Sequence, residues 1–94
     1  MITLDQKLRP HPEVVDTELQ GQETALLHLQ SKLYFSLNTT GSRIWKGLKE
    51  NLTLRQISDR LQREFMVEKE KADRSVLALV DELCQKKLVE PQDD

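Results

Sequence analysis

The sequence of 94 residues has few of the residues on which small binding sites and covalent cross-links are usually built. It has one cysteine, Cys84, which excludes an internal disulfide and fits a reducing compartment. Its three glycines stand apart, which excludes a glycine-rich phosphate-binding loop. Residues 1–9 lack the apolar run of a signal peptide, and no stretch has the length of a membrane span. We therefore expect a cytoplasmic protein that does not associate with membranes.

The same scarcity argues against catalysis. Its two histidines, His11 and His28, stand in separate segments, and with a single cysteine there is no metal-ligand spacing of a recognised kind. The carboxylates fall mostly at positions expected on helix surfaces, and His28 is expected on the surface of a sheet. We therefore expect no enzyme, no cofactor and no metal. The length suits one small domain, residues 1–94, with its core in about 13–90.

Charge is unevenly distributed along the chain, although the net charge is only −2. Residues 43–63 hold six basic side chains against two acids, whereas residues 13–31 hold four acids and no Lys or Arg. Two interpretations stay open: solvated helix faces, or a basic surface for an acidic partner.

Alternating apolar and polar residues predict three short strands in the N-terminal third. They cover residues 14–19 ("VVDTEL"), 23–29 ("ETALLHL") and 33–37 ("LYFSL"), with tight links at Gly21 and at "QSK". Such a pattern is typical of an antiparallel meander, in which the third strand is an edge.

After Asn38 the period of the apolar residues changes to that of a helix. Asn38 is a good N-cap for a helix over 39–50, and Thr53 with Gln56 makes a capping box for the next. A third helix is predicted near 69–87, followed by a polar tail at 90–94 that should fray. The fold class is therefore α+β: a three-stranded antiparallel sheet followed by three α-helices, close to a winged helix-turn-helix.

The third predicted helix has more apolar surface than one core requires. At about 100° per residue, its apolar arc covers roughly half the circumference, whereas a helix on one core needs little more than 100°. The arc contains Ala72, Val76, Leu79 and Leu83, and it is widened by Leu77, Val80 and Cys84. Either the fold covers this helix on two sides, or one flank faces a groove that a partner fills.

Three classes of binding protein remain. A winged-helix DNA-binding regulator needs basic or amide side chains on its third helix, but "SVLALVDELC" is apolar and acidic, so nucleic acid is disfavoured. A peptide could instead add as a fourth strand beside residues 33–37, which contain no proline and no charge. A homodimer or the chain's own N-terminus could also cover this edge.

The segment "LLHLQSKLYFSLNTTGSRIWKGL", followed by "LTLRQISDRLQREFMV" and "LVDELCQKKLVE", resembles the coenzyme-PQQ-synthesis protein D family. The family pattern is a strand pair, a Tyr-Phe-x-Leu-Asn-x-x-Gly corner and an Ile-Trp helix, and the resemblance covers roughly residues 13–90. Two short segments depart from the family pattern. Ser31-Lys32 stands where the family usually has Ser-Gly, and Glu68-Lys69-Glu70 stands where it has Asp-Pro-Glu.

The resemblance implies a small winged-helix-like domain that binds the leader of a ribosomally made precursor peptide. Such a domain presents the precursor to a modifying enzyme, either a radical-SAM enzyme or a leader peptidase, and the final product is left open. The implied strand positions are Leu33, Tyr34, Phe35 and Ser36. On the helix, the helical wheel adds Arg74, Leu77, Asp81 and Cys84.

Overall fold

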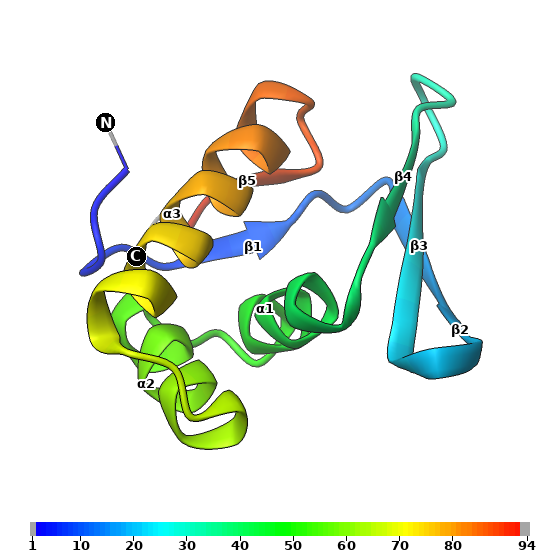
Figure 1. The fold of residues 1–94 in the computed structure, drawn as a ribbon. Helices are drawn as coiled ribbons and strands as arrows, with labels where there is room; N and C mark the ends of the chain where they lie inside the picture. Colours follow the sequence, from blue (N-terminus) through cyan, green and yellow to red (C-terminus); the bar gives the residue numbers. More distant parts are fainter. Residues whose placement is uncertain (1, 93–94) are drawn as a thin grey trace.

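The computed structural model describes residues 2–92, which form a three-stranded sheet, a two-stranded sheet and three α-helices (Figure 1). In chain order the elements are β1 (Leu8–Pro10), β2 (Val14–Leu19), the 3₁₀ turn η1 (Gln20–Gln22), β3 (Glu23–His28), β4 (Tyr34–Leu37), α1 (Thr39–Lys49), α2 (Leu54–Phe65), α3 (Lys69–Gln85) and β5 (Val89–Pro91).

The predicted meander is confirmed. The larger sheet is antiparallel with the order β2-β3-β4, and the three strands begin and end within one residue of the predicted bounds. Val15 pairs with Leu27, which pairs in turn with Tyr34. Within the described chain, β2 and β4 are therefore the edges of this sheet, as the sequence predicts for β4.

The inner face of the meander packs on α1, because alternation along β3 and β4 directs Leu26 and Leu37 into the core. Ile44, Trp45 and Leu48 of α1 are buried against them. The remaining core side chains come from α2, α3 and the segments that flank α3.

Both predicted helix caps are present. The Asn38 side chain accepts a hydrogen bond from the backbone N–H of Gly41 at 2.8 Å, so α1 starts directly after β4. Thr53 and Gln56 form a complete capping box at α2. At α3 the N-cap residue Glu68 makes no side-chain capping bond. Only Asn38 therefore separates β4 from α1.

The expected fraying of the C-terminal tail was wrong for Glu90 and Pro91, while residues 93–94 lie outside the described chain. Val89–Pro91 pairs antiparallel with Leu8–Pro10, and Leu8, Leu88 and Val89 are buried. Strands of three residues are too short to show a period of two, so the sequence pattern does not reveal them. Strand β5 packs against α3, where it covers part of the wide apolar arc, and β1 pairs with β5 (Figure 1).

The expectation that His28 lies on the sheet surface was also wrong. Its side chain is buried, and Nδ1 accepts hydrogen bonds from the backbone N–H groups of Gln30 and Ser31 at 3.2 and 3.3 Å. The ring lies 4.7 Å from that of His11, centroid to centroid. His28 therefore holds the turn that joins β3 to β4.

We predict that Met66→Gly stabilises the fold. Met66 ends α2 in the left-handed region at φ 52° and is 90% exposed, so its side chain contributes little packing. Glycine adopts this conformation without the Cβ clash, which should add about 0.5–1 kcal/mol to the free energy of unfolding, measured with urea.

Met66→Ala is the matched control, because it removes the long side chain and keeps Cβ. It should leave the stability close to that of the original chain. A glycine variant no more stable than the alanine variant would contradict the strain assigned to this residue.

Candidate functional site

A hollow of about 540 Å³ lies between β4, the start of α1 and one flank of α3. We call it the β4–α3 groove. Its lining residues are Phe35, Ser36, Leu37, Asn38, Thr40, Gly41, Ile44, Ser75, Ala78, Leu79 and Glu82. The groove therefore runs beside an open strand edge, with the N-terminus of a helix at one side.

The open edge of β4 offers backbone hydrogen-bonding groups at alternate residues. His28 N–H donates to the carbonyl of Leu33 at 2.9 Å, which makes this a hydrogen-bonded pair of the β3–β4 ladder. In an antiparallel ladder such pairs alternate, so Leu33, Phe35 and Leu37 direct their backbone groups toward β3. The backbone groups of Tyr34 and Ser36 therefore face outward, where they can pair with another extended chain.

The groove beside this edge is lined by both apolar and polar side chains, several of them small. Phe35, Ile44 and Leu79 supply apolar surface, and Glu82 is the one charged side chain in the lining. Gly41 keeps the corner open, since a Cβ there would lie 3.3 Å from Leu37 and from Asn38 Oδ1. The Lys86 ammonium lies 5.9 Å from the Phe35 ring centroid. Apolar side chains of an extended peptide would fit this surface.

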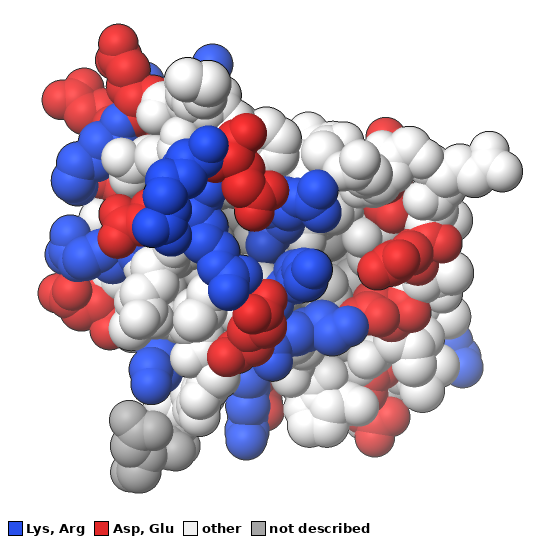
Figure 2. Space-filling view, turned by 90° about the horizontal axis from the view of Figure 1, so that it is seen from below, with Lys and Arg blue, Asp and Glu red and all other residues white. Residues whose placement is uncertain are grey.

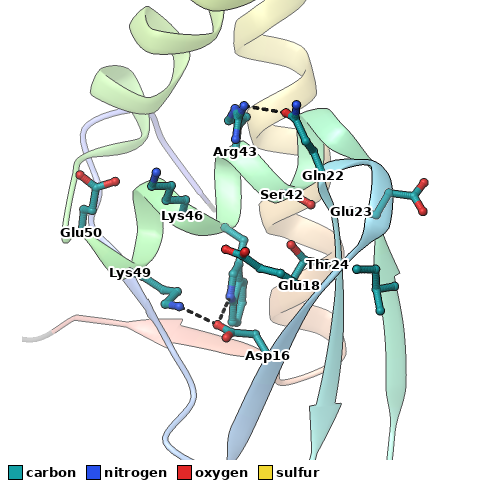
Figure 3. Close-up of a pocket in the computed structure, with 12 residues that line it drawn as sticks. Asp16, Glu18, Gln22, Glu23, Thr24, Ser42, Arg43, Lys46, Lys49 and Glu50 are labelled. Carbon is teal, nitrogen blue, oxygen red and sulfur yellow. Dashed lines mark hydrogen bonds and ion pairs between the residues drawn. The ribbon is translucent and has the colours of Figure 1, made fainter.

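A second hollow, of about 390 Å³, lies between α1 and β2 (Figure 3). It is crossed by a clasp in which Asp16 Oδ2 accepts a hydrogen bond from Trp45 Nε1 at 2.7 Å and pairs with Lys49 Nζ at 2.9 Å. Arg43 donates to Gln22 at its other end. These bonds join the meander to α1, so we assign the hollow a structural role.

The clasp also sets the ionisation of Asp16. Burial alone would raise the pKa of this carboxyl, but the hydrogen bond from Trp45 and the hydrogen bond and charge of Lys49 outweigh it. The pKa of Asp16 therefore lies below its ordinary value, and the carboxylate is the form that the fold stabilises.

Comparison with known proteins then places the chain in a family. The model of the family described as coenzyme PQQ synthesis protein D (PqqD) matches residues 23–89. The chain belongs to the PqqD family.

Two solved structures share the fold of this PqqD-family chain. One is titled "TbiB1 in Complex with the TbiA(beta) Leader Peptide", with 32% identity, a TM-score of 0.83, and coverage of 92% of this chain and 99% of the other. The second is titled "Lasso peptide synthetase B1 complexed with the leader peptide", with 27% identity, a TM-score of 0.82, and coverage of 90% and 99%. Among curated proteins no match was found.

The PqqD-family chain brings only some of the predicted site residues to the groove. Phe35 and Ser36 line it, while Tyr34 directs a 61% exposed side chain to the other face of the sheet. Leu33 precedes β4 and packs half-buried against the core. The predicted strand positions are therefore adjacent in the fold but face different surroundings.

The helix positions Arg74, Leu77, Asp81 and Cys84 do not line the groove. At about 100° per residue they fall on the flank of α3 that lies across the core stripe from Ser75, Ala78, Leu79 and Glu82. Leu77 and Cys84 pack half-buried against the core, and burial followed by the charge of Asp81 raises the pKa of the Cys84 thiol. Arg74 and Asp81 are exposed.

The sequence did not identify the α3 residues that line the groove, because apolar residues widen the core stripe on both flanks of the helix. Leu79 was recognised as apolar, but Ser75 and Ala78 are small residues that carry no signal of their own. Thr40 and Gly41 line the groove because of the way α1 lies relative to α3, which the sequence pattern does not give.

The basic residues of 43–63 mostly form ion pairs within the PqqD-family chain. Arg43 pairs with Glu64 at 2.8 Å, Lys49 with Asp16 at 2.9 Å, Arg55 with Asp5 at 3.1 Å and Arg60 with Glu50 at 3.0 Å. Figure 2, a view from below, shows Lys and Arg interleaved with Asp and Glu over the left and centre of the molecule. At the right, over the sheet, acidic side chains predominate. This pairing favours solvated helix faces over a basic docking surface.

Within residues 2–92, no group of three His, Cys, Asp or Glu side chains is placed to hold a metal ion. Nor does that part of the chain contain a helix long and apolar enough to cross a membrane.

We predict that Asp16→Asn destabilises the PqqD-family chain at pH 7 and that its effect fades in acid. Because the pKa of Asp16 is lower in the folded chain, its carboxylate stabilises the fold fully above the unfolded pKa of about 4. That contribution is lost as pH falls through the folded pKa. Urea denaturation from pH 7 to pH 3 should show the two stabilities converging.

Glu18→Gln is the control, since Glu18 lines the same hollow and forms no ion pair with any residue of 2–92. It should reduce stability far less than Asp16→Asn. A constant difference between Asp16→Asn and the original chain across this pH range would contradict the ionic account of the clasp.

Proposed function

We propose that this chain is a non-catalytic domain that binds the leader segment of a ribosomally made precursor peptide. The leader adds as a fourth strand to the open edge of β4 and places side chains in the β4–α3 groove. The bound precursor is then presented to a modifying enzyme. This proposal is carried by one observation: an unblocked strand edge beside a partly apolar groove, in a fold shared with two proteins solved with leader peptides.

The geometry supports strand addition in two ways. The backbone groups of Tyr34 and Ser36 face outward, as pairing with a guest strand requires. The same edge has no proline and no charged side chain, the devices by which edge strands are usually blocked. Alternate side chains of the guest would point into the groove and make the affinity selective.

The second neighbour supports one kind of partner enzyme over the other. That neighbour is described as a lasso peptide synthetase, and the family resemblance implies a leader peptidase as the partner in lasso-peptide systems. We therefore favour a leader peptidase over a radical-SAM enzyme as the partner. The winged-helix DNA-binding alternative is weakened, because four of the six basic side chains in 43–63 are engaged in ion pairs.

We predict that a synthetic leader, taken from the precursor encoded beside this chain's gene, binds in an alternating pattern. Methylating single backbone nitrogens of the leader should weaken binding at every second position, by about tenfold or more, because only alternate N–H groups pair with β4. Isothermal titration with each methylated peptide measures this.

Ser36→Pro gives the matching change on the protein. It removes an outward N–H and leaves the ladder to β3 intact, so the fold should persist while leader affinity falls. Uniform tolerance of methylation, or undiminished binding by Ser36→Pro, would contradict strand addition. As a test of the DNA-binding alternative, the affinity of the chain for duplex DNA is measured at physiological salt. It should be far lower than the affinity for leader.

We predict that Ala78→Arg weakens leader binding by about tenfold or more, since it fills the groove with a long charged side chain. Ala78 is exposed, so the fold should be unaffected. Asp81→Arg is the control on the other flank of α3 and should change the affinity less than twofold. The reverse result would assign the leader to the flank of Arg74, Leu77, Asp81 and Cys84.

A further inference from the structure

The outer face of the three-stranded sheet, which points away from α1, carries a group of exposed apolar side chains and is uncovered within residues 2–92. Register places Val15, Leu27 and Tyr34 in one row across β2, β3 and β4, and alternation puts Leu19 and Leu29 on the same face. Val15, Leu19 and Leu29 are 44%, 41% and 42% exposed, and Tyr34 is 61% exposed. Single exposed apolar residues are ordinary, but a cross-strand cluster on one face indicates a contact surface.

This clustering is confined to the sheet. Elsewhere in the described chain Met66 is the one other exposed large apolar side chain, and it lies alone at the end of α2. The proposed leader site uses the edge and the opposite face, where Phe35 lines the groove. The outer sheet face is therefore left without a role by leader binding.

The charged side chains that border this face along β2 and β3 are acidic. Leu29 N–H donates to the Glu13 carbonyl at 2.8 Å, so Glu13 continues the register and stands beside Leu29. Glu23 pairs with Leu19 at the other end, and Figure 3 shows it on the side of the sheet opposite Asp16 and Glu18. Neither Glu13 nor Glu23 forms an ion pair with a residue of 2–92. An apolar centre thus lies between two carboxylates about 20 Å apart.

We propose that the outer sheet face docks the modifying enzyme, through an apolar patch on the enzyme that is flanked by Lys or Arg side chains. The opposite charges would steer the encounter and fix its orientation, while the apolar centre supplies affinity. This inference rests on the proposed function, because it assigns the surface by which the leader-bound domain meets its enzyme.

The position of Tyr34 connects this surface to the leader. Its backbone faces the open edge where the leader would pair, and its side chain belongs to the outer sheet face. A guest strand would lie about 4.8 Å from β4, so an enzyme on this face would meet the leader directly. A second copy fits less well, since face-to-face packing about a two-fold axis would bring the carboxylates of both copies together.

The experiment uses the full chain, the synthetic leader, and each purified modifying enzyme encoded beside its gene. Val15→Lys/Leu29→Lys should reduce enzyme affinity by about tenfold or more in biolayer interferometry with saturating leader. Glu13→Lys/Glu23→Lys should also reduce it, with a weaker salt dependence than the original chain. Met66→Lys, at an exposed apolar site elsewhere, should change the affinity less than twofold, and all variants should bind leader as the original chain does.

Enzyme affinity unchanged in Val15→Lys/Leu29→Lys would overturn the proposal. So would a dimer of the original chain in sedimentation that the same variant dissociates, since a second copy would then be the occupant. If leader binds and none of these enzymes binds, docking fails and leader recognition stands. If leader does not bind at all, the proposed function fails, and the enzyme measurement without leader still decides the docking surface.

Discussion

The hydrogen bond between the Asn38 side chain and the backbone N–H of Gly41 is the constraint on which the rest of the candidate site depends. It ends β4 and begins α1 within a single residue, with Leu37 buried on one side of the corner and Ile44 on the other. With Leu37 fixed in the core, alternation commits Phe35 to the groove and the backbone of Ser36 to the open edge. One local cap therefore sets both the depth of the groove and the register that a guest strand would follow.

Much of this arrangement can be predicted from the sequence, because it is encoded locally. The alternation in 14–19 and 23–29, the Asn38 cap and the Thr53–Gln56 box each act within a few residues, and each is found where the pattern indicates. The β1–β5 pair was not predictable in this way, since Leu8 and Pro91 meet across almost the whole chain and their strands have only three residues. The buried position of His28 likewise depends on the turn that its ring caps.

The sequence pattern does not decide which of the two flanks of α3 lies at the groove. A helical wheel measures how wide an apolar arc is, but the neighbouring elements decide which part of the arc is covered. Here β5 packs on α3 and the meander approaches from Ser75 and Leu79. The clasp of Asp16 with Trp45 and Lys49 holds that meander against α1, leaving the β4 edge and the outer sheet face accessible. The domain thus offers two separate surfaces, one suited to a strand and one to a folded partner.

Hydrogen exchange at individual amides of β4 distinguishes strand addition from any other mode of leader binding. In the free chain the amides of Phe35 and Leu37 are bonded to β3, whereas those of Tyr34 and Ser36 face outward. On addition of leader, we expect exchange to slow strongly at Tyr34 and Ser36 and to change little at Phe35 and Leu37. Leader binding that leaves Tyr34 and Ser36 exchanging as fast as in the free chain would contradict strand addition.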